Sequence, residues 1–320
     1  MTTRRTLLHA ATALVALTLA MPAAARADTP MPVVATFSIL GDMVKTIGGD
    51  HVAVTTLVGP DGDAHVYQPT PADARAVSAA DILFVNGLQF EGWIDRLIDA
   101  SGFHGTQVVS TRGIDPIAFD PGGEHDNGED DHDDHAEENG HHHHAGVDPH
   151  AWQSIANALV YVDNITAALA QADPENATVY YMNRAEYVAR LKDLDAHIHD
   201  LVASLPKDRR TIVTSHDAFG YFAQAYGLTF LAPQGMSTES EPSAQDVAHM
   251  ITQIRDNNIA AIFVENITDT RLLDQIALET GTTIGGTLYS DSLSGEHGPA
   301  STYLDMMGYN AATLARALQS

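Results

Sequence analysis

The stretch DPENATVYYMNRAEYVARLKDLDAHIHDLVASLP, residues 173–206, predicts one long helix near the middle of the chain. Asp173 followed by Pro174 is typical of a helix start, and Pro206 marks its end. Apolar residues recur between them at helical spacing, at Tyr180, Tyr187, Val188, Leu191, Leu194, Ile198, Leu201 and Leu205. Because a helix rises about 1.5 Å per residue, this one is longer than a single small domain needs. We therefore interpret residues 173–206 as a spine helix that joins two lobes.

On both sides of the spine helix, short β-rich runs alternate with helical patterns. Four runs precede it: PVVATFSIL (32–40), HVAVTTLV (51–58), DILFVNG (81–87) and TQVVST (106–111). Four runs follow it: TIVTSH (211–216), LTFLAP (228–233), AIFVEN (261–266) and TTIGGTLY (282–289). Strands separated by helix-length segments predict parallel α/β sheets. The expected fold class is α/β, with an N-terminal lobe over 28–172 and a C-terminal lobe over 207–320. Each lobe should hold a central, mostly parallel sheet flanked by helices, and the spine helix that joins them should be rigid.

The N-terminal residues have the pattern of an export signal. Arg4 and Arg5 precede the apolar run LLHAATALVALTLA, and Ala25-Arg26-Ala27 fits the small-x-small pattern of a signal peptidase site. The run is too short to span, as a helix, a hydrocarbon core of about 30 Å. We expect residues 1–27 to be a cleaved signal peptide and the mature protein to be soluble in the periplasm.

Charge and cysteine content narrow the classes of partner. A formal net charge of -26, with only 16 Lys and Arg, argues against nucleic acid, because phosphate binding needs basic patches. Such an acidic field attracts cations instead. The chain has no cysteine, so it needs no disulfide and cannot be anchored through an acylated cysteine. A soluble protein that binds a cation is the expectation.

A low-complexity segment, GGEHDNGEDDHDDHAEENGHHHHAG (122–146), has no apolar periodicity and is predicted to be a disordered His/Asp/Glu-rich loop. Its histidines are candidate accessory, low-affinity metal ligands: His125, His132, His135, His141, His142, His143 and His144. Each bound ion must order backbone at a cost of about 1 to 2 kcal/mol per residue, so such sites should be weak and exchangeable. Two interpretations stay open: the loop captures or senses zinc for a tighter site, or it only adds solubility.

Four isolated residues that can bind a metal ion lie at places suited to a rigid site. His216 and Asp291 come after expected strands, and α/β sheets bind ligands beyond the carboxyl ends of their strands. His65 lies in the proline-rich loop GPDGDAHVYQPTP, and His150 follows Pro149, which restricts the backbone. Two ligands from each half of the chain would place the ion between the lobes. Taken singly, any one of the 17 histidines is more often a surface or core residue than a ligand.

Five segments carry a family resemblance, in this order and over nearly the whole mature chain: GDAHVYQPTPAD (62–73), VDPHAW (147–152), SHDAFGYFAQAYGL (215–228), STESEPSAQD (237–246) and LYSDSLS (288–294). Together they resemble the metal-specific solute-binding proteins of ABC importers, known as cluster A-I or cluster 9. The acidic, His-rich loop before DPHAW is similar to that of the zinc-uptake branch. In two respects the chain departs from the family: Gln68 stands where a glutamate is common, and the C-lobe disulfide of some zinc-uptake members is absent.

The resemblance implies two α/β lobes joined by a rigid helix, with the metal ion in the cleft. It implies metal ligands at His65, His150, His216 and Asp291. It also implies a protein that is not an enzyme and that delivers its ion to a membrane permease. A periplasmic zinc metallochaperone is a further candidate partner, and we expect a monomer.

The ligand types indicate the metal. Three imidazoles and one carboxylate suit Zn²⁺, with bonds of about 2.0 to 2.2 Å. Manganese-specific members of the family tend to place a carboxylate where this chain has His216, so high-affinity zinc binding is predicted, with manganese or iron as the alternative cargo. The rival from another class is a secreted zinc hydrolase, whose zinc would keep three protein ligands and an open position for water. A periplasmic zinc buffer that never meets a permease is a third interpretation.

Overall fold

The structure is a computed structural model that describes residues 29–119, 146–257, 259 and 261–319. The expected signal peptide over 1–27 lies outside these residues. So does nearly all of the expected loop over 122–146, with its seven candidate accessory ligands from His125 to His144.

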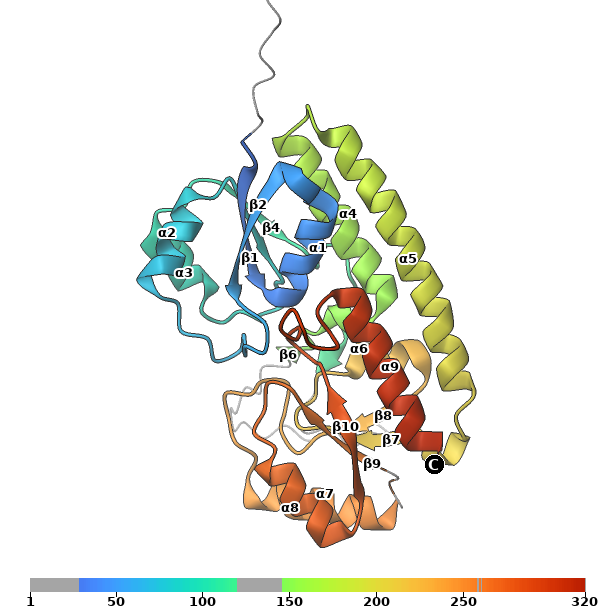
Figure 1. Cartoon of the computed structure of the whole chain (residues 1–320). Coiled ribbons are helices and arrows are strands. Elements are labelled where there is room, and N and C mark those ends of the chain that lie inside the picture. The colour runs from blue at the N-terminus through green and yellow to red at the C-terminus, as the bar shows by residue number, and fades with distance from the viewer. Residues whose placement is uncertain (1–28, 120–145, 258, 260, 320) are drawn as a thin grey trace, which may run out of the picture.

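Two four-stranded sheets form the two lobes, and every strand pair within each sheet is parallel (Figure 1). The N-terminal sheet has the order β2-β1-β3-β4, with β1 (Met31–Phe37), β2 (Val52–Val58), β3 (Ile82–Val85) and β4 (Thr106–Val109). The C-terminal sheet has the order β10-β9-β7-β8, with β7 (Thr211–Val213), β8 (Thr229–Leu231), β9 (Ala261–Glu265) and β10 (Thr283–Leu288). A short antiparallel ribbon pairs β5 (Ala118–Phe119) with β6 (Gly146–Val147). The predicted α/β class, with parallel sheets in two lobes, is confirmed.

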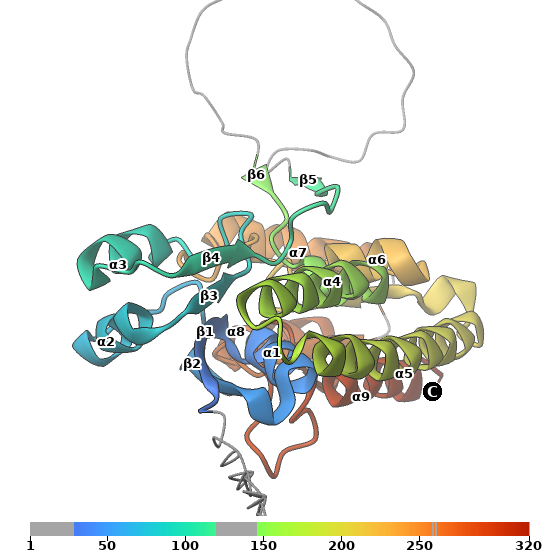
Figure 2. The ribbon, with the colours of Figure 1, turned by 90° about the horizontal axis from the view of Figure 1, so that it is seen from above.

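Helices cover both faces of each sheet. Around the N-terminal sheet, α2 (Pro71–Ala79) and α3 (Ile94–Ser101) lie on one side, and α1 (Ser38–Gly48) and α4 (Ile155–Ala172) on the other (Figure 2). Around the C-terminal sheet, α7 (Ala244–Asp256) and α8 (Arg271–Thr280) cover one face, and α6 (Gly220–Tyr226) and α9 (Tyr303–Gln319) the other. Three single turns of 3-10 helix complete the structure: η1 (Gly49–His51), η2 (Ala151–Gln153) and η3 (Lys207–Arg209).

The spine helix, α5 (Ala177–Ala203), has 27 residues and runs beside both lobes (Figure 1). It packs against α1 and α4 in the N-terminal half and against α6 and α9 in the C-terminal half. At about 1.5 Å per residue it is about 40 Å long, shorter than the predicted 173–206. Asp173 does not start it: this residue ends α4, and its carboxylate accepts hydrogen bonds from Tyr180 and Asn176 at 2.6 and 2.8 Å. These bonds close a tight turn between two consecutive helices, so residues 173–176 are not helical.

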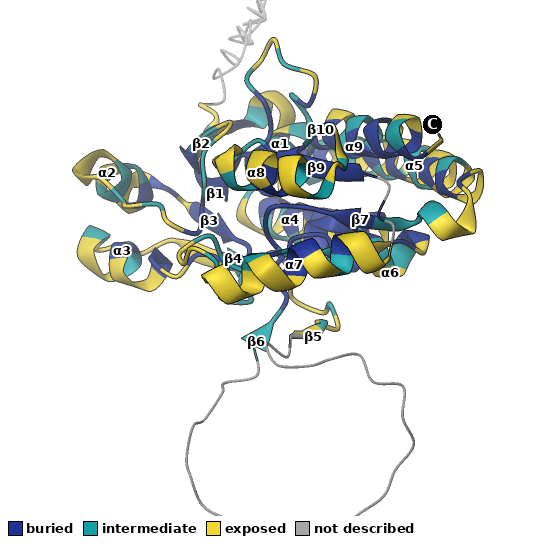
Figure 3. Ribbon diagram, turned by 90° about the horizontal axis from the view of Figure 1, so that it is seen from below, coloured by how far each residue is buried: buried dark blue, intermediate teal, exposed yellow. Residues whose placement is uncertain are grey.

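One hydrophobic core continues from the N-terminal sheet through the helices to the C-terminal sheet. It includes Phe84 of β3, Tyr187 of α5 and Phe263 of β9. The opposite face of the C-terminal sheet has its own smaller core, to which Val213 and Ile262 contribute. The two faces are served by alternate residues along each strand, as the two-residue repeat of a strand requires. Figure 3 shows these buried strands between helices whose outer faces are exposed. The shared core ties the two lobes and α5 into one packed unit.

Candidate metal centre

His65, His150, His216 and Asp291 converge at one point between the sheets. Each offers one ligand atom, and these atoms all lie within 4.8 Å of one another. His65 is 7% exposed and the other three are exposed by 1% or less. The structure thus brings together the four residues that the sequence analysis singled out, three of them without meaningful access to solvent.

The spacing of the four ligand atoms suits a transition-metal ion. Oδ2 of Asp291 lies 3.1 Å from Nε2 of both His65 and His216. Nε2 of His150 lies 3.3 Å from Nε2 of His65 and 3.6 Å from Oδ1 of Asp291. Ligands bound about 2.0 to 2.1 Å from a tetrahedral ion are separated from one another by roughly 3.3 to 3.4 Å. These separations lie close to that value, and all pairs among the four ligand atoms are within 4.8 Å.

The parallel sheets explain how residues so distant in sequence meet. His65 follows β2, His216 and Asp291 each come three residues after a strand, and His150 opens η2 after β6. All strands of a parallel sheet end at the same edge, where α/β proteins bind their ligands. In Figure 1, β1 and β10 point toward each other, so these edges of the two lobes face the same space.

His150 is oriented by Asp148. Its Nδ1 donates to Oδ1 of Asp148 at 2.8 Å, and the same oxygen accepts the backbone N–H of His150 at 2.9 Å. The amide of Asn86 donates to the carbonyl of Pro149 at 2.9 Å and holds the chain between them. A proton on Nδ1 leaves the lone pair of Nε2 free for a metal ion.

His216 also has a carboxylate beside its Nδ1 atom, that of Glu265, the last residue of β9. Oε2 of Glu265 lies 2.7 Å from Nδ1 of His216. Its Oε1 accepts the backbone N–H groups of Ser215 and His216 at 2.8 and 2.9 Å. The sequence analysis missed the roles of Glu265 and Asp148. The sequence offered a signal for Glu265, because this residue lies at the end of a predicted strand. His216 and Asp291, in the same lobe, also lie close to strand ends.

His65 is held by different contacts. Its ring meets the ring of Phe90 edge to face, with the centroids 4.8 Å apart. Its backbone N–H donates to Oδ1 of Asp63 at 2.9 Å, and the indole of Trp93 donates to the carbonyl of Ala64 at 2.8 Å. His65 is therefore positioned by the backbone and packing of its loop, whereas the other two imidazoles lie against carboxylates.

In the centre, burial and nearby charges shift the pKa of each group in opposite directions. Burial lowers the pKa of His150, but the carboxylates of Asp291 and Asp148 outweigh it and raise that pKa to about 9. For His216 the same contest, with Glu265 and Asp291, raises the pKa well above its ordinary value. Burial raises the pKa of Asp291, yet His150 and His216 bring it well below the ordinary value. A metal ion that binds to these imidazoles must therefore displace protons from them.

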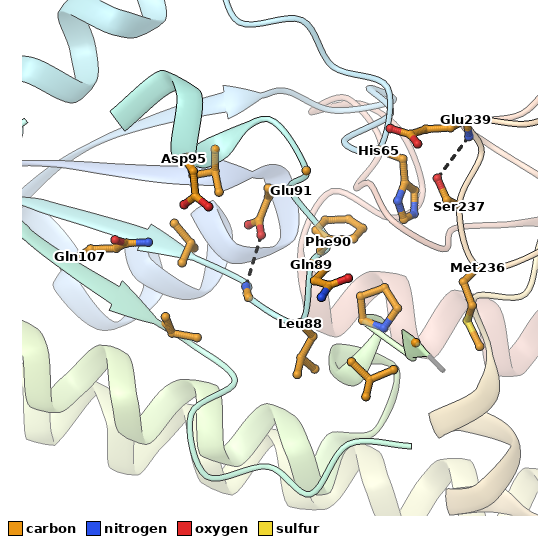
Figure 4. A pocket seen from close by; sticks show the side chains of 18 residues that line it. His65, Leu88, Gln89, Phe90, Glu91, Asp95, Gln107, Met236, Ser237 and Glu239 are labelled. Carbon is orange, nitrogen blue, oxygen red and sulfur yellow. Dashed lines mark hydrogen bonds between the residues drawn. The ribbon is translucent and has the colours of Figure 1, made fainter. Parts of the chain in front are cut away.

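One oxygen of Asp291 also fits a centre that binds a cation. Its Oδ1 is buried without a hydrogen-bond partner among the described residues. A buried acceptor left unpaired is costly, and a metal ion would satisfy it. A cavity of about 640 Å³ also adjoins the centre, with His65 on its wall between the 87–95 segment and residues 236–239 (Figure 4).

Two parallel-sheet lobes with a buried cluster of metal-binding side chains between them define a metal-binding solute-binding protein. Residues 33–317 match the family described as "Zinc-uptake complex component A periplasmic". The chain belongs to this family, whose members are periplasmic metal-binding components of ABC importers and work with a permease and an ATPase. Among the described residues, no helix is both long and apolar enough to cross a membrane.

Relatives in this family carry names with different metals. The iron-binding protein YfeA of Yersinia pestis is 34% identical over 285 residues, which cover 89% of this chain and 85% of YfeA. The manganese-binding lipoprotein MntA of Halalkalibacterium halodurans is 32% identical, over 90% of this chain and 88% of MntA. The solved structure of the periplasmic zinc-binding protein TroA of Treponema pallidum superposes with a TM-score of 0.81 at 27% identity, covering 91% of this chain and all of that one.

Proposed function

We propose that this protein captures Zn²⁺ at His65, His150, His216 and Asp291 and delivers it to the permease of an ABC importer. The observation that carries the proposal is the convergence of three imidazole nitrogens and one carboxylate, buried and within 4.8 Å of one another. Imidazole suits zinc, whereas manganese prefers sites richer in oxygen. Orientation of two imidazoles by carboxylates is typical of zinc sites in proteins.

Manganese or iron is the second candidate cargo. The observations in its favour are the names of YfeA and MntA and the position of Asp291, both of whose oxygens face the imidazoles. A carboxylate that binds through both oxygens would add a fifth donor atom. Since zinc binds most protein sites more tightly than manganese or ferrous iron does, affinity alone cannot identify the cargo. The metal content of protein taken from its native compartment can.

We propose that the protein is a carrier and not a zinc hydrolase. A catalytic zinc has three protein ligands and an open position for water. Here four protein side chains surround one point, and Asp291 stands where the water of an enzyme would bind.

We further propose the route and the partners that the sequence indicated. Residues 1–27 would direct export and be removed, residues 173–206 would divide the chain into lobes over 28–172 and 207–320, and the mature protein would act in the periplasm as a monomer. MntA is named a lipoprotein, but the 320 residues of this chain include no cysteine to carry a lipid. A zinc metallochaperone would be a second partner, and the histidines of residues 125–144 would be accessory sites.

A competition titration tests the proposal. Zinc is titrated against a chromophoric chelator into metal-free protein, into a deletion of residues 124–144, and into a His150→Ala variant. One tight site should survive the deletion and be lost in His150→Ala. Tight binding that disappears with the deletion, or persists in His150→Ala, would place the main site elsewhere.

A second measurement tests the cargo. Protein secreted to the periplasm of cells grown with zinc, manganese and iron at equal concentration is purified and its metals are counted by mass spectrometry. We expect one zinc ion per chain. Manganese or iron at that stoichiometry would replace zinc as the cargo and leave the role as an importer component unchanged.

A further inference from the structure

The loop that carries His65 is hydrogen-bonded to the opposite lobe at its base. The backbone N–H of Asp61 donates to the carbonyl of Leu293 at 2.9 Å, and the amide of Asn266 donates to Oδ1 of Asp61 at 3.1 Å. The hydroxyl of Ser292, next to Asp291, lies 3.3 Å from the carbonyl of Gly59. These contacts hold the start of the loop beside the residues that directly follow Asp291 and beside the end of β9.

Asp63 makes a further contact across the lobes, closer to the metal centre. Its Oδ1 accepts the backbone N–H of His65 at 2.9 Å, and its Oδ2 accepts the hydroxyl of Thr238 at 2.6 Å. Both bonds are partly shielded from solvent. A single carboxylate thus joins the backbone of one candidate ligand to the C-terminal lobe. Hydrogen bonds to an ionised acceptor are roughly twice as strong as neutral ones.

Thr238 lies in a loop that leads back to His216. Gln234, at the start of this loop, pairs with His216 as an isolated parallel bridge, and the backbone N–H of Asp217 donates to the carbonyl of Gly235 at 3.1 Å. The amide of Gln234 donates to the carbonyl of Ser240 at 2.8 Å and closes the loop over residues 234–240. A chain of contacts therefore runs from His65 through Asp63 and Thr238 to His216, without passing through the metal centre.

This second path matters because His65 lacks the support that the other two imidazoles have. Asp148 and Glu265 lie against the Nδ1 atoms of His150 and His216, whereas no carboxylate among the described residues pairs with Nδ1 of His65. His65 also lines the cavity beside the centre, as do Met236, Ser237 and Glu239 on either side of Thr238 (Figure 4). The position of its loop then decides whether its imidazole reaches the ion.

We propose that Asp63 is a positioning residue that locks His65 in place by bonding Thr238 across the cleft, and that this bond slows dissociation of the metal ion. The inference rests on the proposed function, since it takes His65 to be a ligand. Loss of the Asp63–Thr238 bond would free the loop over 234–240 from the loop of His65 and let that imidazole leave first. The other three candidate ligands do not depend on this bond, so the ion would still bind.

Stopped-flow measurement of zinc release into excess chelator tests the proposal with the full-length protein. Thr238→Val should speed dissociation about tenfold, the size expected for losing one hydrogen bond to a charged group. The association rate should stay within about twofold. A merely structural role would lower the melting temperature without speeding the release of zinc. Thr238→Ser, which keeps the hydroxyl, should restore slow release.

Matched variants separate this bond from the loop as a whole. Ser237→Ala removes a neighbouring hydroxyl that accepts the N–H of Glu239 within the same loop, and it should release zinc at the wild-type rate. Asp63→Ala should release zinc at least as fast as Thr238→Val, and the double variant should be no faster than Asp63→Ala alone.

Equal release rates in Thr238→Val and Ser237→Ala would overturn the inference, even with the proposed function intact. Failure of the proposed function has a different signature, namely tight zinc binding that persists in His150→Ala.

Discussion

Replacing Glu265 with glutamine tests whether a carboxylate behind His216 strengthens metal binding. Oε2 of Glu265 lies 2.7 Å from Nδ1 of His216, and Oε1 accepts two backbone N–H groups. Glutamine has nearly the same shape, and its carbonyl can keep both backbone bonds. Its amide group would face Nδ1, so the substitution removes the negative charge and the preference for a proton on that nitrogen.

The magnitude follows from the distances. Across the imidazole ring and a metal–nitrogen bond of about 2.1 Å, the carboxylate would lie roughly 7 Å from the ion. At an effective dielectric constant of about 20, the single negative charge of Glu265 and the double positive charge of Zn²⁺ attract each other by about 5 kcal/mol at that distance. Most of this is offset, because without metal Glu265 instead helps to hold a proton on His216, whose pKa it raises. The attraction between Glu265 and the positive charge of a protonated His216, roughly 4 Å away, is about 4 kcal/mol by the same calculation.

The difference of about 1 kcal/mol predicts a dissociation constant that is roughly five- to tenfold larger for Glu265→Gln at pH 7. Looser orientation of the imidazole adds to it, and loss of such an outer partner typically costs about 10- to 100-fold in affinity. The expected loss is therefore at least about tenfold. The assay is the chelator competition with zinc, run on wild type and Glu265→Gln.

Asp269→Asn provides the control. Asp269 is an exposed carboxylate of the same lobe that pairs with Arg271, so its loss changes the net charge equally without touching the centre. Equal zinc affinity for Glu265→Gln and wild type would refute the reasoning. So would an equal loss of affinity in Asp269→Asn, because long-range charge would then explain the effect.

Three further predictions concern protons and packing. Zinc affinity should rise by about two log units per pH unit from pH 6 to 8, since His150 and His216 each lose a proton when the ion binds. Calorimetry in buffers of different ionisation enthalpy counts the protons released. A count of zero would contradict this prediction. Burial raises the pKa of Asp42 to about 6, so the folded protein binds its proton more tightly than the unfolded chain and stability falls as pH rises from about 4 through 6. Asp42→Asn should therefore be more stable than wild type at pH 8 and equal to it at pH 4 in urea unfolding; equal stability at both values would argue against a buried charge. Gly220→Ala should weaken zinc binding, because the new Cβ would lie 2.5 Å from Oδ2 of Asp148 and displace it, although alanine in a helix usually stabilises by about 1 kcal/mol; unchanged affinity would exclude this contact.

The sequence was a good guide to the elements of the fold. The eight strands were predicted from short β-rich runs between turn residues, and all are present. The long helix was predicted from its apolar spacing, but its start was wrong by several residues. In sequence, Asp173 looks like the first residue of a helix. In the structure it follows the end of α4, and its carboxylate accepts a hydrogen bond from Tyr180 that closes the turn between the two helices. A cap and a turn-closing carboxylate use the same residue type, and only the path of the chain distinguishes them.

For the candidate site, too, some features could be predicted from the sequence and others depend on the tertiary structure. By itself the sequence determined which residues can bind a metal and predicted that parallel strands would deliver several of them to one edge, because residue type and the alternation of strand and helix patterns are local properties. That these groups bind metal stays a prediction. Asp148 lies only two residues from His150, but only the tertiary structure decided the partners that are distant in sequence: Glu265 lies 49 residues from His216, and Asp63 lies 175 residues from Thr238. The Glu265–His216 pair depends on how β7 and β9 lie side by side in one sheet, and the Asp63–Thr238 pair on how the two lobes pack; no local pattern records either arrangement.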